Sequence, residues 1–410
     1  MKKIIVIGGG AAGMMAAISA AELSKNIILL EKTNFLGKKL SITGKGRCNI
    51  TNFADIPEII KNILGNGRFL NSVLKNFDSN DTINFFESLG VKTKIERGNR
   101  VFPMSDNAKE VVDALINKMI NLGVDIRTNA RVTKIITTDK KITGVEINNK
   151  IESADAVILA TGGASYPATG STGDGFKLAK QVGHTITKIL PALVPLETEE
   201  EFVKDLQGLS LKNVRVTIFA DNKKIADEFG EMLFTHFGVS GPIILSLSRQ
   251  VSFLLSENKF VELSINLKPA LTPEQLSARV LRDFEKFKRK SAKNALVDLL
   301  PSKLISVILD LAFIDEEKHI DSITQAERRR LIEILRDLRL TITKTRSIEE
   351  AIVTAGGIST KEINPKTMES KIISGLFFAG EVVDVDGFTG GFNLQAAFAM
   401  ANAAGKFSCT

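Results

Sequence analysis

The chain opens with two short apolar runs that flank a glycine turn and an alanine-rich segment. Lys3–Ile7 and Asn26–Leu30 have the length and apolar character of buried strands, and Gly13–Leu23 between them favours a helix. The second run ends in Glu31. This order predicts a βαβ unit, from which parallel sheets are built.

Further along, the pattern changes character twice. A helical periodicity over 107–122 is followed by β-type runs, and after Gly183 several segments alternate between apolar and polar positions. The chain then becomes helical and returns near its end to α/β character punctuated by glycine. The β-type segments are 124–137, 142–147, 156–160, Asn213–Phe219 and Phe260–Asn266.

Composition limits the classes of protein that fit this pattern. The 410 residues are 44% hydrophobic and 25% charged, as in globular proteins of more than one domain. Two cysteines, Cys48 and Cys409, and three histidines are too few for a disulfide scaffold or a metal centre, so we expect no metal and a reducing cytoplasm. The apolar run Ile4–Ile7 is too short for a signal peptide, and no run reaches membrane-spanning length. The net charge of +7 suits an anionic ligand without requiring one.

The glycine turn carries the fingerprint of a dinucleotide-binding motif. Gly8, Gly10 and Gly13 fit G-x-G-x-x-G after a strand and before a helix. Gly8 permits the tight turn, Gly10 lets the backbone approach a pyrophosphate, and Gly13 lets helix and strand pack closely. Glu31, 18 residues after Gly13, can accept hydrogen bonds from a ribose hydroxyl. The alternative is an ordinary glycine turn in an α/β domain.

Two distant segments favour FAD over NAD as the dinucleotide. The run Ala156–Ala160 leads into A-T-G-G, which resembles the second fingerprint of flavoproteins of the two-dinucleotide type. Gly375–Glu381 resembles the third fingerprint, in which an acidic segment meets the ribityl chain and phosphate. The helix after Gly390–Leu394 can direct its N-terminal amides at the flavin. Each segment alone is equally compatible with a loop, but the three in this order favour FAD.

The loop KKLSITGKGRCNITN, residues 38–52, is a further candidate for flavin contact. Gly44 and Gly46 can let the backbone approach a planar ring. Three of its basic side chains can neutralise phosphate or the N1–C2=O end of a reduced flavin. They are Lys39, Lys45 and Arg47.

Four residues are candidates for the chemistry itself. Tyr166 precedes the glycine-rich segment 170–175, and His236 lies between a strand and a Gly-Ser-Gly-Pro turn; both are candidate proton donors. The alternatives are that segment 170–175 only caps the next helix, and that His236 is structural and caps the helix after it. Arg47 and Cys48 complete the set, with Cys48 either a reactive thiol or a packing or flavin-contacting residue.

Together these segments resemble the BaiN-like/YhiN-like family of NAD(P)/FAD-dependent flavoproteins. The resemblance covers nearly the whole chain and rests on GKGRCNITN, SYPATGSTGDGFKLAKQVGH, LFTHFGVSGP, TAGGIST, NPKTMESK and GEVVDVDGFTGGFNLQAAFAMANAAG. The family's usual loop has three consecutive glycines before Arg-Cys-Asn, whereas Lys45 interrupts them here. A more remote resemblance, through T-G-D-G, extends to the fumarate reductase and ketosteroid dehydrogenase group.

The resemblance implies an α/β fold: a glutathione-reductase-like, Rossmann-type FAD-binding domain with an inserted β-barrel and helical subdomain. Residues 1–187 and 346–410 are then expected to form the FAD-binding domain. The β-barrel-like insert is expected at 188–271 and 337–345, and the helical insert at 272–336. Thr272-Pro273-Glu274 is a typical helix start.

The resemblance also implies a reaction. Members of the family are linked to reduction of conjugated C=C bonds in steroid-like enones and of uracil in ribosomal RNA, and some carry the label aminoacetone oxidase. We therefore expect a flavin reductase of an activated C=C bond that uses NAD(P)H. No second G-x-G-x-x-G is present, so NAD(P)H must bind transiently at the flavin, or another donor must serve. The alternatives are an RNA dihydrouridine synthase, an amine or ketone oxidase, and a non-catalytic flavin-carrying RNA-binding protein.

The residues expected to bind FAD come from all of these segments. They are Gly8, Gly10, Ala11, Ala12, Gly13, Glu31, Lys32, Lys39, Gly44, Gly46, Arg47, Cys48, Asn49, Val132, Thr161, Gly162, Gly163, Gly380, Glu381, Asp384, Gly391, Phe392, Asn393 and Leu394.

The helical insert is basic. Between Leu271 and Arg346 there are 16 Lys and Arg against 12 Asp and Glu, a difference of +4. On one continuous helix, four of the basic residues would share a face, namely Lys286, Arg289, Lys290 and Lys293. Such a face is either a solvated surface or a patch that grips RNA phosphates and offers a base to the flavin.

Overall fold

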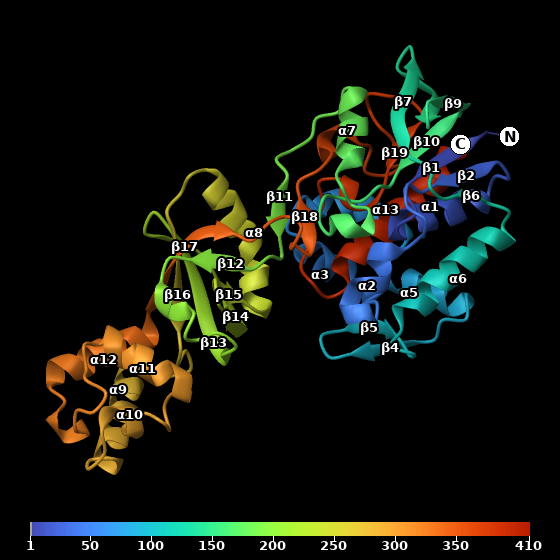
Figure 1. The fold of residues 1–410 in the computed structure, drawn as a ribbon. Helices are drawn as coiled ribbons and strands as arrows, with labels where there is room; N and C mark the ends of the chain where they lie inside the picture. Colours follow the sequence, from blue (N-terminus) through green and yellow to red (C-terminus); the bar gives the residue numbers. More distant parts are fainter. Residues whose placement is uncertain (1) are drawn as a thin grey trace. The chain divides into compact units, whose positions relative to one another are not determined.

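The computed structural model describes residues 2–410, which divide into two compact units (Figure 1). The first unit runs to Leu190 and resumes over Ile348–Thr410, and the second is Pro191–Ser347. Each unit has its own hydrophobic core. The division falls two or three residues from the boundaries expected at 187 and 346. It also keeps barrel and helices together, because both contribute to one core.

A five-stranded parallel sheet organises the first unit, with the strand order β19-β10-β1-β2-β6. Every residue of β1 (Ile4–Ile7), β2 (Ile27–Leu30) and β10 (Ala156–Leu159) is buried. Strands covered on both faces are continuously apolar, which is the pattern the sequence shows. The predicted βαβ unit is confirmed, since β1 and β2 pair in parallel. The remaining two strands are β6 (Asp125–Arg127) and β19 (Leu376–Phe378).

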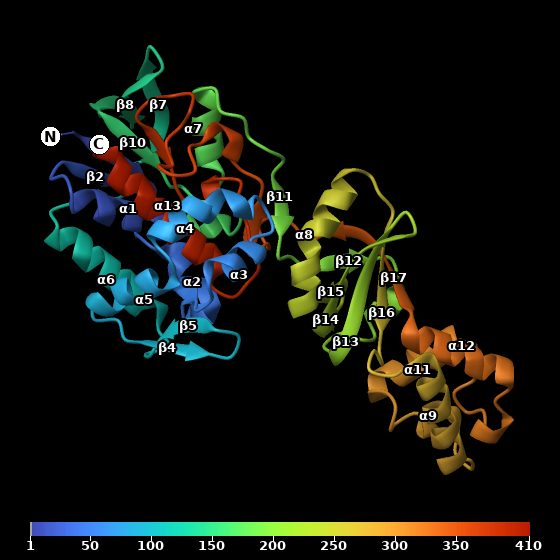
Figure 2. The ribbon, with the colours of Figure 1, turned by 180° about the vertical axis from the view of Figure 1, so that it is seen from behind.

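Two helices from opposite ends of the chain pack closely in this unit (Figure 2). They are α1 (Ala11–Ala21) and α13 (Phe392–Ser408), and most residues of each are buried. Small side chains permit the approach: a Cβ added to Gly405 would lie 2.5 Å from the Ala16 carbonyl oxygen. The C-terminal helix is therefore held beside the glycine turn at the N-terminus.

The other elements of the first unit surround this centre. A three-stranded sheet, β3-β5-β4, and a second one, β7-β8-β9, extend from it. The helices are α2 (Lys38–Gly46), α3 (Ile56–Lys61), α4 (Asn71–Asn76), α5 (Ser79–Ser88), α6 (Ala108–Asn121) and α7 (Asp174–Gln181), with the 3₁₀ turns η1 (Gly67–Leu70), η2 (Pro167–Thr169), η5 (Thr360–Glu362) and η6 (Gly380–Val382). The strands are β3 (Thr51–Asn52), β4 (Thr93–Glu96), β5 (Arg100–Pro103), β7 (Val132–Thr138), β8 (Lys141–Ile147), β9 (Lys150–Ser153) and β18 (Val353–Ala355).

The second unit contains a closed six-stranded barrel with the order β12-β15-β14-β13-β16-β17. Its strands alternate between buried and more exposed positions, as in β16, where Val261, Leu263 and Ile265 point into the core. The strands are β12 (Leu196–Thr198), β13 (Ser210–Ala220), β14 (Lys223–Thr235), β15 (Gly238–Ser240), β16 (Val261–Asn266) and β17 (Leu338–Thr345); β11 (Leu190–Ala192) precedes them. The helix α8 (Pro242–Ser256) and the turn η3 (Glu201–Val203) complete this part.

Between β16 and β17 lies a group of helices. The predicted start at Thr272 is confirmed: Thr272 and Gln275 form a capping box in which each side chain bonds the other's backbone N–H. The elements are α9 (Pro273–Lys286), α10 (Ala292–Ala295), α11 (Ser302–Leu311), η4 (Ile320–Ser322) and α12 (Gln325–Arg336). Among residues 2–410, none of these or the other helices is long and apolar enough to cross a membrane.

Candidate functional site

The glycine turn between β1 and α1 has the shape that the fingerprint predicts. Gly8 has φ of 106°, and a Cβ there would lie 2.5 Å from the Ala160 carbonyl oxygen. A Cβ at Gly13 would overlap the Gly8 carbonyl oxygen. Gly10 differs, because a Cβ there would meet nothing within 4 Å. The N-terminus of α1, with Ala11 and Ala12 in its first turn, therefore faces open space at Gly10.

This open helix end suits an anion. The first turn of α1 contains no acidic residue, and its backbone N–H groups carry the partial positive charge of a helix N-terminus. A pyrophosphate is the group that such a glycine turn accommodates.

Glu31 stands at the end of β2, beside the same turn. Its Oε2 accepts a hydrogen bond from Gly9 N at 2.7 Å, and its Oε1 accepts one from Thr33 N at 2.7 Å. These bonds fix the carboxylate, and each oxygen keeps a second lone pair for a ribose hydroxyl. Ala130 N bonds the Glu31 carbonyl oxygen at 2.9 Å, which places the chain that leads to Val132 next to this carboxylate.

The glycine-rich segment 170–175 lies on the same side. Lys32 Nζ contacts Thr172 Oγ1 at 2.5 Å and Asp174 Oδ2 at 2.8 Å. A Cβ at Gly170 would lie 3.2 Å from the Thr33 side chain. The segment begins α7, but the residue before that helix is Gly173, whose lack of a side chain leaves no side-chain cap. The Lys32–Asp174 ion pair thus joins the segment to the residues after Glu31.

The A-T-G-G segment after β10 meets the C-terminal segment directly. A Cβ at Gly163 would overlap Thr354 and lie 3.0 Å from Glu381 Oε1. Gly162 has φ of 73°. Among the described residues, the buried Thr161 Oγ1 has no recorded hydrogen-bond partner. A buried hydroxyl normally finds a partner, so Thr161 is a candidate ligand contact.

Glu381 follows Gly380 in the turn η6. A Cβ at Gly380 would lie 2.7 Å from Ala12 Cβ, so this turn runs against the first turn of α1. Glu381 accepts hydrogen bonds from Lys39 Nζ at 2.7 Å and from Thr354 N at 2.7 Å. Burial raises the pKa of the Glu381 carboxyl, but the charge of Lys39 and these hydrogen bonds outweigh it and hold that pKa below its ordinary value.

The N-terminus of α13 is held by side chains on both sides. Asn49, with its amide turned so that both atoms find partners, accepts from Gly391 N at 3.0 Å. Asn393 bonds Gly387 N and O at 2.8 Å each and Phe388 O at 3.1 Å. The amide of Asn393, expected at the flavin, therefore supports the preceding loop.

Neighbouring residues of the same segment are held in place by backbone hydrogen bonds or by side-chain packing. Asp384 N donates to Ile358 O at 3.0 Å, and Asp384 O accepts from Asn66 Nδ2 at 2.7 Å. Phe392 is buried and Leu394 partly buried, and both pack in the core of the first unit.

The chain from the C-terminal end of α2 to Cys48 takes an unusual backbone path. Gly44, Lys45, Gly46 and Cys48 all have φ between 58° and 84°. Lys45 and Cys48 are the costly members, since a left-handed conformation costs a residue with a Cβ about 1 kcal/mol. For Lys45, this is a physical reason for the glycine that the resembling family carries at that place. A Cβ at Gly46 would meet nothing within 4 Å.

The surroundings of Arg47 favour a structural role over the expected contact with the flavin. Arg47 binds Glu96 at 2.5 Å and Asp106 at 2.6 Å, and its guanidinium lies 4.1 Å from the centre of the Phe102 ring. Hydrogen bonds to Glu96 and Asp106 raise the Arg47 pKa. Two carboxylates thus neutralise this cation. They lie 49 and 59 residues away along the chain, so the local sequence pattern could not reveal them.

Burial argues against the alternative of Cys48 as a reactive thiol. The side chain is fully buried, and burial raises the pKa of the thiol to about 12. It therefore stays protonated near neutral pH, whereas nucleophilic cysteines need a low pKa and access. Cys48 is a packing residue in the core of the first unit.

The two candidate proton donors have different surroundings. Tyr166 is partly buried in the first unit, with Lys39 Nζ 6.0 Å from the centre of its ring. His236 is exposed in the second unit, in the turn between β14 and β15. The alternative in which His236 caps the next helix is wrong, because Gly241 occupies the N-cap of α8.

The single basic helix face expected in the second unit does not form. Lys286 is the last residue of α9, Arg289 and Lys290 lie in a turn, and Lys293 belongs to α10. Lys286 pairs with Asp298 at 2.5 Å, and Lys293 pairs with Glu316 at 2.6 Å. The helix ends at Lys286, and acidic partners neutralise part of the charge.

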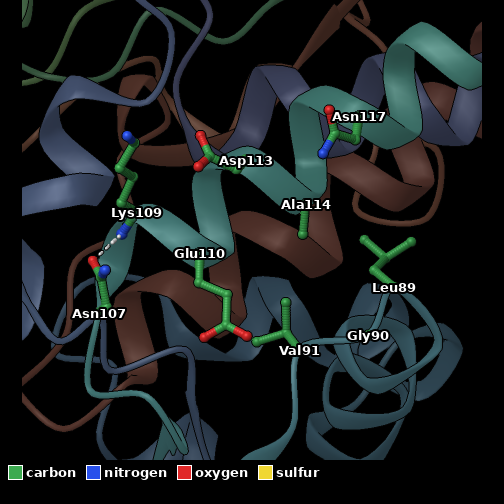
Figure 3. A pocket seen from close by; sticks show the side chains of 9 residues that line it. All are labelled: Leu89, Gly90, Val91, Asn107, Lys109, Glu110, Asp113, Ala114 and Asn117. Carbon is green, nitrogen blue, oxygen red and sulfur yellow. Dashed lines mark hydrogen bonds between the residues drawn. The ribbon is translucent and has the colours of Figure 1, made fainter.

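Figure 3 shows a surface pocket of about 400 Å³ in the first unit. None of the residues expected to bind FAD lines it. Its walls come from the residues that follow α5, from the residue before α6 and from the N-terminal part of α6, namely Leu89, Gly90, Val91, Asn107, Lys109, Glu110, Asp113, Ala114 and Asn117.

One position that sequence reasoning missed is Thr354. Its Oγ1 accepts from Ala164 N at 2.8 Å and from Ser165 N at 3.1 Å, and its own N–H donates to Glu381. Only its place in the glycine-rich segment TAGGIST could have indicated it.

Comparison with known proteins gives the chain its relatives. The HI0933-like protein Rossmann domain matches residues 2–407. The 3-dehydro-bile acid delta(4,6)-reductase of Clostridium scindens is 33% identical over 99% of this chain and 98% of its own length. The ribosomal RNA dihydrouridine synthase of Haemophilus influenzae is 32% identical over 97% and 96%.

Solved structures agree on the fold. The 3-ketosteroid-delta4-(5alpha)-dehydrogenase of Rhodococcus jostii RHA1 superposes with a TM-score of 0.54 and 15% identity, over 100% of this chain and 97% of that one.

Proposed function

Because this chain belongs to the HI0933-like family, we propose that it is an FAD-dependent oxidoreductase that reduces an activated C=C bond of an unsaturated carbonyl compound. One observation carries the proposal. Two relatives that match almost the full chain, at 33% and 32% identity, are named for the saturation of a C=C bond in chemically different substrates. The feature common to both is a C=C bond conjugated to a carbonyl group.

The residues of the first unit fit FAD. The open space at Gly10 accommodates a pyrophosphate at the N-terminus of α1, and Glu31 is fixed where a ribose hydroxyl can reach it. The buried hydroxyl of Thr161 supplies a further polar contact.

The reaction adds a hydride and a proton across the double bond. FAD, when bound and reduced, would supply the hydride that the β-carbon receives, with NAD(P)H as the proposed reductant. The protein must then deliver a proton to the α-carbon. Tyr166 is the stronger candidate for that donor, since it lies in the first unit beside Lys39 and Ser165. His236 is the second candidate.

Uracil in ribosomal RNA is a second candidate substrate. The Haemophilus influenzae relative favours it, because the C5=C6 bond of uracil is also conjugated to a carbonyl. The predicted basic helix face does not form in the second unit, and acidic partners neutralise Lys286 and Lys293. Fewer basic side chains are therefore available for RNA phosphates than the sequence predicted. For this reason we place a small unsaturated carbonyl compound first.

Anaerobic reoxidation tests the proposal. The protein is loaded with FAD, reduced with NADPH and mixed with a 3-oxo-4-ene steroid or with ribosomal RNA stripped of dihydrouridine. We expect the steroid to restore the absorbance of oxidised flavin in one equivalent. Reoxidation by RNA alone would replace the first substrate with the second. Reoxidation only by oxygen, with release of peroxide, would identify an oxidase and overturn the proposal.

A further inference from the structure

A partly buried ion pair joins four distant segments of the first unit. Lys39 Nζ lies 2.7 Å from Glu381 Oε2 and 2.6 Å from Ser165 Oγ. Glu381 Oε1 accepts from Thr354 N at 2.7 Å and from Ser165 Oγ at 3.0 Å. Ser165 and Thr354 are both almost completely buried. The carboxylate is therefore fixed by three groups, and through it the ammonium group is fixed as well.

The pair stands next to the open turn of α1. Gly37, two residues before Lys39, donates its N–H to Gly9 O at 2.8 Å. Gly380, one residue before Glu381, packs directly against Ala12. Both partners therefore emerge from segments that flank the N-terminus of α1, where the pyrophosphate of FAD is expected.

We propose that Lys39 stabilises the negative charge that the flavin ring gains on reduction, and that Glu381 is the positioning residue that holds its ammonium group there. Ser165 and Thr354 in turn hold Glu381. The inference rests on the proposed binding of FAD, and it adds a control of the reduction potential that the choice of substrate does not affect.

Charge balance favours the ring over the pyrophosphate. A pyrophosphate is always anionic, so Glu381 beside it would repel it and cancel much of what Lys39 contributes. The ring is neutral when oxidised and gains charge on reduction. A lysine paired with a carboxylate destabilises the neutral, oxidised ring only a little. Its directed N–H groups stabilise the charged, reduced ring. An ammonium group has three donors, and two acceptors are recorded for Lys39 among the described residues.

The other cations of the same loop are less suitable. Arg47 is neutralised by Glu96 and Asp106. Lys45 lies at the left-handed turn, outside the ion pair. Lys39 is thus the basic residue of the loop that points into the frame made by Ser165 and Glu381.

Opposite shifts in reduction potential test the proposal. The potential of bound FAD is measured by anaerobic dye-linked titration in the wild type, Lys39→Met, Glu381→Gln and the double variant, without substrate. Lys39→Met should weaken the preference for reduced over oxidised FAD about tenfold, which lowers the two-electron potential by about 30 mV. Glu381→Gln keeps a hydrogen-bond acceptor for Lys39 but removes the negative charge that opposes reduction, so it should raise the potential, and the double variant should return towards the wild type. Glu96→Gln, which removes a carboxylate bound to Arg47, serves as the control and should leave the potential unchanged.

Misfolding would not produce shifts of opposite sign. Shifts of the same sign in both single variants, or no shift in either, would overturn the proposal. A loss of affinity that is equal for oxidised and reduced FAD, with the potential unchanged, would make Lys39 a phosphate anchor and also overturn it. An unexpected substrate leaves this test intact, whereas a wild type that does not bind FAD defeats both proposals at once.

Discussion

At the scale of single residues, the three fingerprint glycines have different reasons to be glycine. Gly13 is required by packing, because a Cβ there would overlap the Gly8 carbonyl oxygen. Gly10 is not required by packing, because a Cβ there meets nothing within 4 Å. The fold alone gives no reason for Gly10, whereas a bound pyrophosphate does.

This difference predicts the effect of Gly10→Val. The new side chain should fill the space for the pyrophosphate and weaken FAD binding by more than about tenfold, while the free energy of unfolding of the apoprotein changes by less than about 1 kcal/mol. Gly13→Ala should instead destabilise the apoprotein itself. Fluorescence titration with FAD and urea unfolding measure the two quantities. Full FAD affinity in Gly10→Val would remove the pyrophosphate from this turn.

Cys48 supports a second prediction at this scale. Because burial raises the pKa of its thiol to about 12, Cys48 should not react with a thiol reagent while the protein is folded. In a Cys409→Ser background, Cys48→Ala should keep turnover within about twofold and cost roughly 1 kcal/mol of stability. Rapid labelling of native Cys48, or a large loss of turnover in Cys48→Ala, would return it to the chemistry.

At the scale of elements, the close packing of α1 on α13 links the two ends of the chain. Gly405→Ala would place a Cβ 2.5 Å from the Ala16 carbonyl oxygen, so we expect a loss of about 1–3 kcal/mol in the free energy of unfolding. Lys406→Ala, at the exposed next position, is the matched control and should change stability by less than about 0.5 kcal/mol. Equal stability of the two variants in urea unfolding would mean that the helices are not held at this distance.

A buried histidine ties three elements together and gives stability a pH dependence. His184, after α7, bonds Glu362 at 3.1 Å and Ser370 at 2.8 Å. Burial lowers the pKa of His184 below its ordinary value of 6.5, so the unfolded chain takes up the proton first as pH falls. The stabilisation that neutral His184 gives the folded protein is fully present above pH 6.5, and it is lost as pH falls towards the lowered pKa. His184→Gln should flatten this part of the curve of stability against pH; an unchanged slope would contradict the assignment.

The sequence predicted contiguous elements better than long-range partners. The βαβ unit, α6 and the capped start of α9 were visible because their patterns are local. The barrel register, the carboxylates that bind Arg47 and the loop that Asn393 supports depend on residues brought together by folding. The prediction of a single basic helix face was wrong for a local reason. The helix ends at Lys286, and a helical wheel does not detect that end.

At the scale of the whole molecule, two separate cores predict two unfolding steps. Calorimetry should resolve one unfolding transition for each unit. FAD should raise the midpoint temperature only of the transition that belongs to the first unit, which contains the dinucleotide-binding fingerprint. At a hundredfold excess over its Kd, FAD should stabilise that unit by about 2.7 kcal/mol. A single transition that FAD moves as a whole would show that the units unfold together.

The central claim is that two hydrogens are added across a C=C bond conjugated to a carbonyl. The most direct measurement is the mass of the product after turnover with NADPH and an enone steroid in deuterated water. Both the N5 hydrogen of reduced flavin and the delivered proton exchange with solvent, so we predict a saturated ketone with deuterium at the β-carbon and at the α-carbon. A substrate recovered unchanged, or a product with an added oxygen or a lost amine, would contradict the account.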